Sequence, residues 1–377
     1  MRAPLNVLIT SITLRYRMGV ELYVRDLAVG LKRMGHAPCV YAPETGSVAV
    51  ELQSQGIPVV TRVRDVPVAP DVIHGNQQRE TLAALIHFRT PPAIFVCHSH
   101  TSWGSSPPQH PRIRRYLGVS RLCVERLRAE GAPHDQIGVS FNSVDTTRFL
   151  PRATLPPKPR RALVFSNYAG ESTQLPAIRD ACATLGIELD VVGMRTGTVT
   201  DRPEDLLGQY DLVFAKAKAA LEAMAVGAAV VLCDFAGLGP MVTTGNVDRL
   251  RLTNFGHEAL SEPIDSESII RRIEEYDARD AALVRDRIRD VASADRAVTS
   301  LVALYREVLA EEAASAPAEE NDLRYLVAMA RDYIPEKVFL SLLAMDPRMR
   351  DALRLKGLNP VRSQVMRLIF GRTGRSD

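Results

Sequence analysis

The chain has 377 residues, a length typical of two domains at roughly 150 residues each. A composition of 46% hydrophobic and 24% charged residues indicates a globular protein, and a formal net charge of +3 is too small to indicate a nucleic-acid partner. The 5 cysteines include no C-x-x-C pair, which argues against a zinc or disulfide framework and predicts buried reduced thiols.

Apolar runs that could span a bilayer are missing from the sequence. The longest uncharged apolar run, Ala223 to Cys233, is about half the length required. The apolar segment "PLNVLITSI" runs directly into polar residues and does not resemble a secretory leader. We therefore expect a cytoplasmic protein. The alternative is a location at the inner face of the membrane, which the basic C-terminal tail could contact.

The first part of the chain alternates between short apolar runs and helical patterns. "LNVLIT" predicts a buried parallel strand, and "GVELYVRDLAVGLKRMGH" then places apolar residues at helical spacing. Further strands are expected at "PCVYAP", "IPVVTR", "PDVIHG", "PAIFVCH", "YLGVS" and "QIGVSF", with helices over residues 80–88 and 121–130. This alternation predicts an α/β domain with a doubly wound parallel sheet over residues 1–155.

Prolines and basic residues interrupt the pattern in "PRATLPPKPRR", where we place an interdomain linker. A second series follows, with strands at "ALVFSN", "ELDVVG", "DLVFA" and "AAVVLCD" and helices over residues 174–185 and 219–225. It predicts a second α/β domain over residues 156–315, of which residues 266–313 are helical. Residues 316–377 are expected to form a basic helical extension that packs on the body rather than lying on a membrane.

The segment "FAKAKAALEAMAVGAAVVLCD" contains a lone carboxylate, Glu222, in a predicted helix that leads into an apolar strand. Free backbone amides and the positive end of the helix dipole attract phosphate at a helix N-terminus, and Lys216 and Lys218 add positive charge there. Carboxylates commonly bind a ribose diol in nucleotide sites of open α/β sheets, and Glu222 lies about one turn inside the helix. The alternative is an exposed glutamate favoured only by helix propensity.

"LEAMAVGAAVVLCDFAGLGPMV" closely resembles the ribose-binding helix and following strand of retaining glycosyltransferases with the GT-B fold, especially family 4. In the same order, "GVELYVRDLAVGLKRMGH", "DVIHGN", "IFVCHSH" and "YLGVSRLCVERLRAEGAPHDQIGVSFNSVDTTRF" resemble segments of the acceptor domain of that family. The resemblance covers roughly residues 6–256 in pieces. It implies two Rossmann-like domains, with the acceptor bound by the first and a nucleotide sugar bound by the second.

The resemblance also implies roles for individual residues. Gly19 matches a glycine at the start of the first helix that lets backbone approach the donor phosphates or the acceptor, although the usual second glycine is Met18 here. His98 matches a histidine that contacts the transferring sugar, and it is the candidate catalytic residue, with loop packing as the alternative. Glu222 matches the second glutamate of an E-x7-E pattern, whose first position is occupied by Phe214.

The arginine and lysine that usually contact the pyrophosphate in this family are absent from "ALVFSNYAGES", which contains the candidate contact Asn167. By their chemistry, Lys216, Lys218 and Arg195 are candidates to neutralise the phosphates instead. For each of them, a solvated surface position is the alternative.

These observations predict a glycosyltransferase that moves a sugar, with retention, from a nucleoside-diphosphate sugar to an unknown acceptor hydroxyl on a glycan, lipid or small molecule. No metal or other cofactor is expected, because the H-x-H pair at His98 and His100 has no third ligand with suitable spacing. Two alternatives remain. One is an epimerase or hydrolase of nucleotide sugars with the same fold, and the other is a catalytically silent binding protein.

Overall fold

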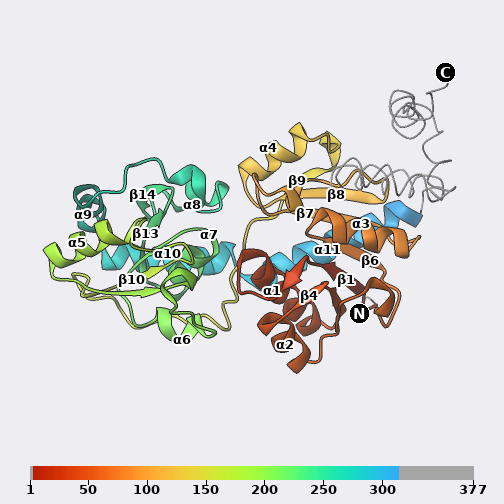
Figure 1. Ribbon diagram of the computed structural model, residues 1–377, viewed down its shortest axis with the longest axis horizontal. Coiled ribbons are helices and arrows are strands. Elements are labelled where there is room, and N and C mark those ends of the chain that lie inside the picture. Colours follow the sequence, from red (N-terminus) through yellow and green to blue (C-terminus); the bar gives the residue numbers. More distant parts are fainter. Residues whose placement is uncertain (1–2, 314–377) are drawn as a thin grey trace, which may run out of the picture.

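The computed structural model describes residues 3–313, which form two lobes side by side (Figure 1). The first lobe contains a parallel sheet of 7 strands in the order β5-β3-β1-β6-β7-β8-β9. Its central strands β1, β6 and β7 are apolar and almost wholly buried, as expected when helices cover both faces, whereas the edge strands β5 and β9 are partly exposed. Their bounds are β1 Asn6–Thr10, β3 Ala37–Tyr41, β5 Val59–Val60, β6 Val72–Gly75, β7 Ala93–Cys97, β8 Ile113–Gly118 and β9 Ile137–Val139.

Helices and short turns connect the strands of the first lobe. The α-helices are α1 Gly19–Arg33, α2 Ser47–Ser54, α3 Gln78–His87 and α4 Arg121–Ala129. Single 3-10 turns lie at η1 Val63–Asp65, η2 Trp103–Ser105 and η3 His134–Gln136, and a small parallel ribbon joins β2 Thr13–Leu14 to β4 Glu44–Thr45.

The second lobe contains a sheet of 5 strands in the order β11-β10-β12-β13-β14. Its strands are β10 Arg161–Phe165, β11 Glu188–Val192, β12 Leu212–Ala215, β13 Ala229–Asp234 and β14 Gly237–Met241. β14 runs antiparallel to β13. The sequence does not predict this strand, because its glycines and proline are unusual in a strand interior. The helices of this lobe are α5 Leu175–Leu185, α6 Pro203–Leu207, α7 Ala217–Val226, α8 Val247–Leu252, α9 Ser266–Glu274 and α10 Ala278–Val291, with η4 Met194–Thr196 and η5 His257–Ala259.

The last described helix, α11 (Ala294–Ala313), returns to the first lobe (Figure 1, blue). Four of its residues recur at helical spacing and are buried in the core of that lobe: Val298, Leu301, Tyr305 and Val308. A Cβ added at Gly30 of α1 would lie 2.7 Å from Cγ2 of Val298, so the two helices touch closely. The sequence pattern places this segment in the second domain, whereas in the structure it completes the core of the first.

Val144 and Phe149 pack in the core of the second lobe, so the chain crosses between the lobes before the proline-rich segment that was predicted as the linker. Each strand and helix expected in the two alternating series has a counterpart at its predicted place, which confirms the α/β class. All 5 cysteines are buried and unpaired, as predicted. Within residues 3–313, no helix has the length and apolar character needed to cross a membrane. The basic extension predicted for residues 316–377 lies outside the described residues.

Candidate functional site

A cleft of about 870 Å³ lies between the lobes, at the carboxyl ends of both sheets. In the first sheet β1 lies between β3 and β6, and in the second β10 lies between β11 and β12, so each sheet changes the direction of its connections beside its first strand. Ligands of open α/β sheets bind at such a point. Ile12 and Gln77 follow β1 and β6, Asn167 and Lys216 follow β10 and β12, and all four line the cleft.

The cleft has two walls. The first-lobe wall includes Gly19, Glu21, Gln77, Glu80, His98 and Trp103, and the second-lobe wall includes Asn167, Gly193, Lys216, Ala217, Lys218 and Glu222. Five of the predicted site residues therefore meet here with the candidate catalytic His98, although they come from distant parts of the chain.

Glu222 lies inside α7, a helix of mostly small apolar residues that packs directly on the sheet. Its side chain lines the cleft although the residue is only 3% exposed. Oε1 lies 3.4 Å from Nζ of Lys218. Burial raises the pKa of Glu222, and the nearby Lys218 charge opposes that rise. Glu222 is therefore a buried carboxylate at the edge of a cavity, rather than the exposed helix residue of the alternative interpretation.

Lys218 does not project freely into the cleft. Its Nζ lies 2.6 Å from Oδ2 of Asp26 on α1 and donates to the carbonyl of Ser143 at 3.1 Å. Burial opposes ionisation of Asp26, but the charges of Lys218 and Arg25 outweigh it and hold the Asp26 pKa below its ordinary value. The lysine predicted as a phosphate ligand thus joins the two lobes through an internal ion pair.

Lys216, the residue just before α7, is also paired within the protein. It forms an ion pair with Asp234, a fully buried residue at the end of β13. Its Nζ lies 5.5 Å from the ring centroid of Tyr168 and 5.4 Å from that of Phe235, so two aromatic rings flank the cation. About a fifth of the Lys216 side chain stays exposed, and the residue lines the cleft.

Phe214, which occupies the first position of the E-x7-E pattern, is fully buried in β12. Only Lys216 separates the end of this strand from the start of α7. A carboxylate at position 214 would therefore be buried in the core of the sheet and would not line the cleft.

His98 follows β7 at the cleft, and a hydrogen-bond chain fixes its ring. Nε2 lies 2.8 Å from Oδ1 of Asn76, whose Nδ2 donates to the carbonyl of Thr10 at 2.8 Å. Because the amide nitrogen of Asn76 is directed at that carbonyl, Oδ1 faces His98 and Nε2 carries the hydrogen. Burial lowers the pKa of His98 to about 3. The ring is therefore neutral at pH 7, with Nδ1 as its hydrogen-bond acceptor.

A buried layer behind His98 was not anticipated from the sequence. The Tyr23 ring packs edge-on against His98, with ring centroids 4.6 Å apart. Its hydroxyl lies 3.2 Å from Nε2 of His74, and Nδ1 of His74 lies 2.6 Å from the hydroxyl of Tyr305 on α11. Burial, together with the neighbouring His98, lowers the pKa of His74 to about 3. The layer links the cleft to the helix that returns from the second lobe.

Of the three remaining predicted site residues, two line the cleft and one does not. Gly19 begins α1 at the cleft, and a Cβ built there would have no atom within 4 Å, so protein packing does not require a glycine. Asn167 lines the cleft and accepts a hydrogen bond from the Met194 amide at 3.3 Å. Arg195 donates to the Tyr168 carbonyl at 3.4 Å and does not line the cleft, so the structure does not bring it to the site.

Two acidic residues of the first-lobe wall were missed. Glu21 lies in the first turn of α1 and Glu80 in the first turn of α3, with exposed fractions of 6% and 1%. The available signal was that each begins a helix just after a strand, where ligands of open sheets bind. Within residues 3–313, no cluster of three or more His, Cys, Asp or Glu side chains is arranged to hold a metal ion.

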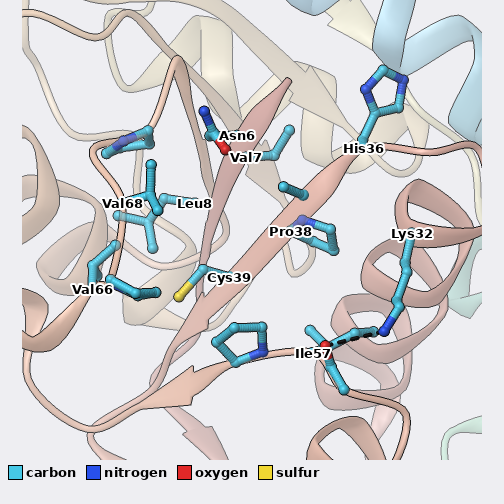
Figure 2. Close-up of a pocket in the computed structure, with 15 residues that line it drawn as sticks. Asn6, Val7, Leu8, Lys32, His36, Pro38, Cys39, Ile57, Val66 and Val68 are labelled. Carbon is cyan, nitrogen blue, oxygen red and sulfur yellow. Dashed lines mark hydrogen bonds between the residues drawn. The ribbon is translucent and has the colours of Figure 1, made fainter. Parts of the chain in front are cut away.

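A second hollow of about 300 Å³ lies at the opposite end of the first sheet (Figure 2). It is lined by the first residues of β1 and β3 and by apolar side chains of the 57–70 segment. Nζ of Lys32 closes one side by donating to the Gly56 carbonyl at 3.1 Å. Because it lies at the amino ends of the parallel strands, it is not where ligands of this architecture bind.

No protein-family model and no curated protein matches the sequence. Solved structures do match. A glycosyltransferase from Rickettsia africae ESF-5 aligns with a TM-score of 0.60 at 14% identity, over 82% of this chain and 99% of its own. Anabaena Alr3699/HepE, in complex with UDP and glucose, aligns with a TM-score of 0.61 at 15% identity, over 80% of this chain and 99% of its own.

The sucrose-phosphate synthase from Thermosynechococcus elongatus aligns with a TM-score of 0.52 at 14% identity, over 81% of this chain and 100% of its own. These alignments span both lobes of the described chain. The chain has the GT-B fold. At such low identity the likeness establishes the architecture of two Rossmann-like domains and leaves the chemistry to the residues of the cleft.

Proposed function

We propose that the protein is a retaining glycosyltransferase that binds a nucleoside-diphosphate sugar on the second-lobe wall and an acceptor hydroxyl on the first-lobe wall. The observation that carries the proposal is Glu222, a buried carboxylate that lines an interlobe cleft one turn inside a helix N-terminus. The HepE structure contains UDP and glucose, which supports a nucleotide sugar as the ligand class for a cleft of this architecture.

In this proposal the ribose hydroxyls donate to the carboxylate of Glu222. The diphosphate accepts from the next backbone amides of the first turn of α7, those of Lys218 and Ala219, because the amide of Ala217 already donates to the Phe255 carbonyl. It gains further stabilisation from Lys216. Lys218 does not neutralise the diphosphate in this proposal, because Asp26 already compensates its charge. It helps to position the carboxylate of Glu222, with which it also forms an ion pair.

Transfer with retention requires little of the side chains. The bond between the anomeric carbon and the diphosphate oxygen breaks, and the acceptor oxygen bonds to the same carbon on the same face of the sugar. The acceptor proton passes to an oxygen of the departing diphosphate. Neutral His98, held at Nε2 by Asn76, offers Nδ1 to a hydroxyl of the transferring sugar. Closure around both substrates excludes water and holds the acceptor oxygen beside the leaving diphosphate oxygen, on the same face of the sugar. The proposed mechanism involves no metal ion.

Thermal unfolding in the presence of UDP, GDP, ADP and their sugars tests the donor. A ligand present at a hundred times its Kd stabilises the native state by about 2.7 kcal/mol, so the correct nucleotide should raise the Tm clearly. If none of these nucleotides or sugars shifts the Tm, the protein is not a nucleotide-sugar enzyme, and a catalytically silent binding protein becomes the better interpretation.

Glu222→Gln tests the ribose contact. Hydrogen bonds to charged groups contribute about 1.5–3 kcal/mol, so the donor Kd should rise at least tenfold. Glu267→Gln, at an exposed position of α9, is the matched control and should leave the Kd unchanged. A donor Kd within twofold of wild type in Glu222→Gln would show that the ribose assignment is wrong.

The reaction class is tested with the donor that binds. Incubation without acceptor should leave the donor intact, whereas rapid release of the nucleoside diphosphate or an epimerised sugar would favour a hydrolase or epimerase. With an acceptor, NMR of the product should show the anomeric configuration of the donor. An inverted product would contradict the proposed mechanism.

A further inference from the structure

Glu21 is a carboxylate of the first-lobe wall that the protein itself leaves without a cation. It lies in the first turn of α1 beside Gly19, lines the cleft and is only 6% exposed. No described lysine, arginine or histidine forms an ion pair with it, and its own backbone amide is the only hydrogen-bond donor that acts on the carboxylate in the described chain. Burial raises the pKa of Glu21. A ligand hydroxyl at the cleft would supply the missing donor.

Glu80 is a second such group, in the first turn of α3. Its Oε1 lies 2.7 Å from Nη2 of Arg79, whereas Oε2 is buried and has no hydrogen-bond partner among the described residues. The residue is 1% exposed and lines the same cleft. A buried carboxylate oxygen without a donor is unfavourable, which marks a position that a bound group can complete.

Trp103 adds a large apolar surface to this wall. It lies in η2, is 40% exposed and lines the cleft together with Gln77 and Ser102. Sugars have apolar C–H faces that pack on aromatic rings and hydroxyls that donate to carboxylates and side-chain amides. Both kinds of group face one wall here.

We propose that the first-lobe wall binds a polyhydroxylated acceptor, a sugar or other polyol, through hydrogen bonds to Glu21 and Glu80 and packing on Trp103. The inference rests on the proposed glycosyl transfer and names the class of its acceptor. A hydrocarbon chain would leave both buried carboxylates against apolar groups. The arginines that line the same side of the cleft, Arg17, Arg25 and Arg79, already form ion pairs with Glu51, Asp26 and Glu80. A polyol satisfies the oxygens without adding charge.

The sequence contains 1 tryptophan, so intrinsic fluorescence reports on this wall directly. The protein, saturated with the nucleotide that raises its Tm, is titrated with pentoses, hexoses, hexosamines, inositol and oligosaccharides of two to four units, and with 1-octanol as an apolar alcohol. At least one polyol should give a saturable change in Trp103 emission. Its Kd should rise at least tenfold in Glu21→Gln and in Glu80→Gln.

Glu125→Gln on α4, outside the cleft, is the control and should bind as wild type does. Circular dichroism shows whether each variant folds, and two independent glutamate variants keep the test usable if one does not. A panel without a saturable polyol, a saturable response to 1-octanol alone, or unchanged polyol Kd values in both glutamate variants would overturn the proposal. Donor binding is measured separately by thermal unfolding, so a failed polyol test with intact donor binding leaves the proposed function standing.

Discussion

The two walls of the cleft place their charges in opposite ways. On the second-lobe wall, Lys216 is paired with Asp234 and Lys218 with Asp26, so both cations are compensated before a ligand binds. On the first-lobe wall, Glu21 has no cation partner among the described residues, and one oxygen of Glu80 has no donor. A diphosphate would therefore depend mainly on the backbone amides of α7, whereas an acceptor would depend on side chains. The second-lobe wall would thus hold its ligand through the fixed dipoles of backbone amides, and the first-lobe wall would hold its ligand through carboxylates that lack partners.

Lys218→Met gives the largest expected effect, because it removes the cation of a buried cluster. Asp26 and Glu222 would remain with one partner fewer in a water-poor interface between α1 and α7. Removing one member of a buried ion pair typically costs about 3–5 kcal/mol, and we expect that loss in the free energy of unfolding measured with urea. Lys158→Met, at an exposed position, is the control.

The double variant Asp26→Asn with Lys218→Met sharpens this result, since it removes both charges of the pair. It should recover at least half of the stability lost in Lys218→Met. A loss below about 1 kcal/mol in the single variant would indicate an ordinary surface pair, and the contrast between the two walls would then fail.

The buried layer behind the first-lobe wall makes a prediction about pH through His74. Its folded pKa of about 3 lies below the ordinary value of 6.5, so the unfolded chain binds the proton more readily between these values. The stability associated with the neutral ring is present above pH 6.5 and is lost as the pH falls towards 3. Each histidine of this kind makes the free energy of unfolding fall by up to about 1.4 kcal/mol per pH unit.

His74→Gln should therefore reduce the dependence of stability on pH below 6.5, even if the variant is less stable at pH 7 because it perturbs contacts with Tyr23 and Tyr305. Urea unfolding at pH 7, 6, 5 and 4.5 measures the slope, and His134→Gln, at an exposed position, is the control. Equal slopes in wild type and His74→Gln would show that the ring is not held neutral by burial.

The sequence predicted the fold well because apolar runs of strand length alternate with helical patterns, and this signal is local. It did not predict that α11 packs on the first lobe, because Val298 and Tyr305 would form an amphipathic face on either domain. β14 was missed because it is held by its pairing with β13 and not by strand propensity. These elements depend on tertiary contacts that no local pattern records.

Which residues meet in the candidate cleft could be predicted in part, for the same reason. Gly19 begins a helix, His98 follows a strand and Glu222 lies about one turn inside a helix, and the topology brings them to one cleft. The placement of Lys218 could not be foreseen, because its partner Asp26 is 192 positions away in the chain. Burial of Glu21 and Glu80 also appears only once the lobes are folded. Their lack of partners is a property of the three-dimensional surroundings.

The smallest expected effect concerns the two helix starts that face the cleft. Gly19 at the start of α1 does not adopt a positive φ, whereas Ala217 at the start of α7 has φ 49°, where an alanine is strained. Its amide donates to the Phe255 carbonyl at 2.8 Å, which helps to hold the conformation. Ala217→Gly should relieve the strain and raise the free energy of unfolding by about 0.5–1 kcal/mol, after the greater freedom of glycine in the unfolded chain is subtracted.

Ala219→Gly, two positions further along α7, is the matched control. There the backbone is within the helix, so glycine should lower the free energy of unfolding by about 0.5–1 kcal/mol. Opposite signs at positions 217 and 219 in urea unfolding would locate backbone strain at the point where α7 offers its amides to the cleft. A loss of stability in both variants would mean that the backbone at Ala217 is relaxed. The position of the α7 start beside the cleft would then depend on the ion pairs of Lys216 and Lys218 and not on a strained backbone.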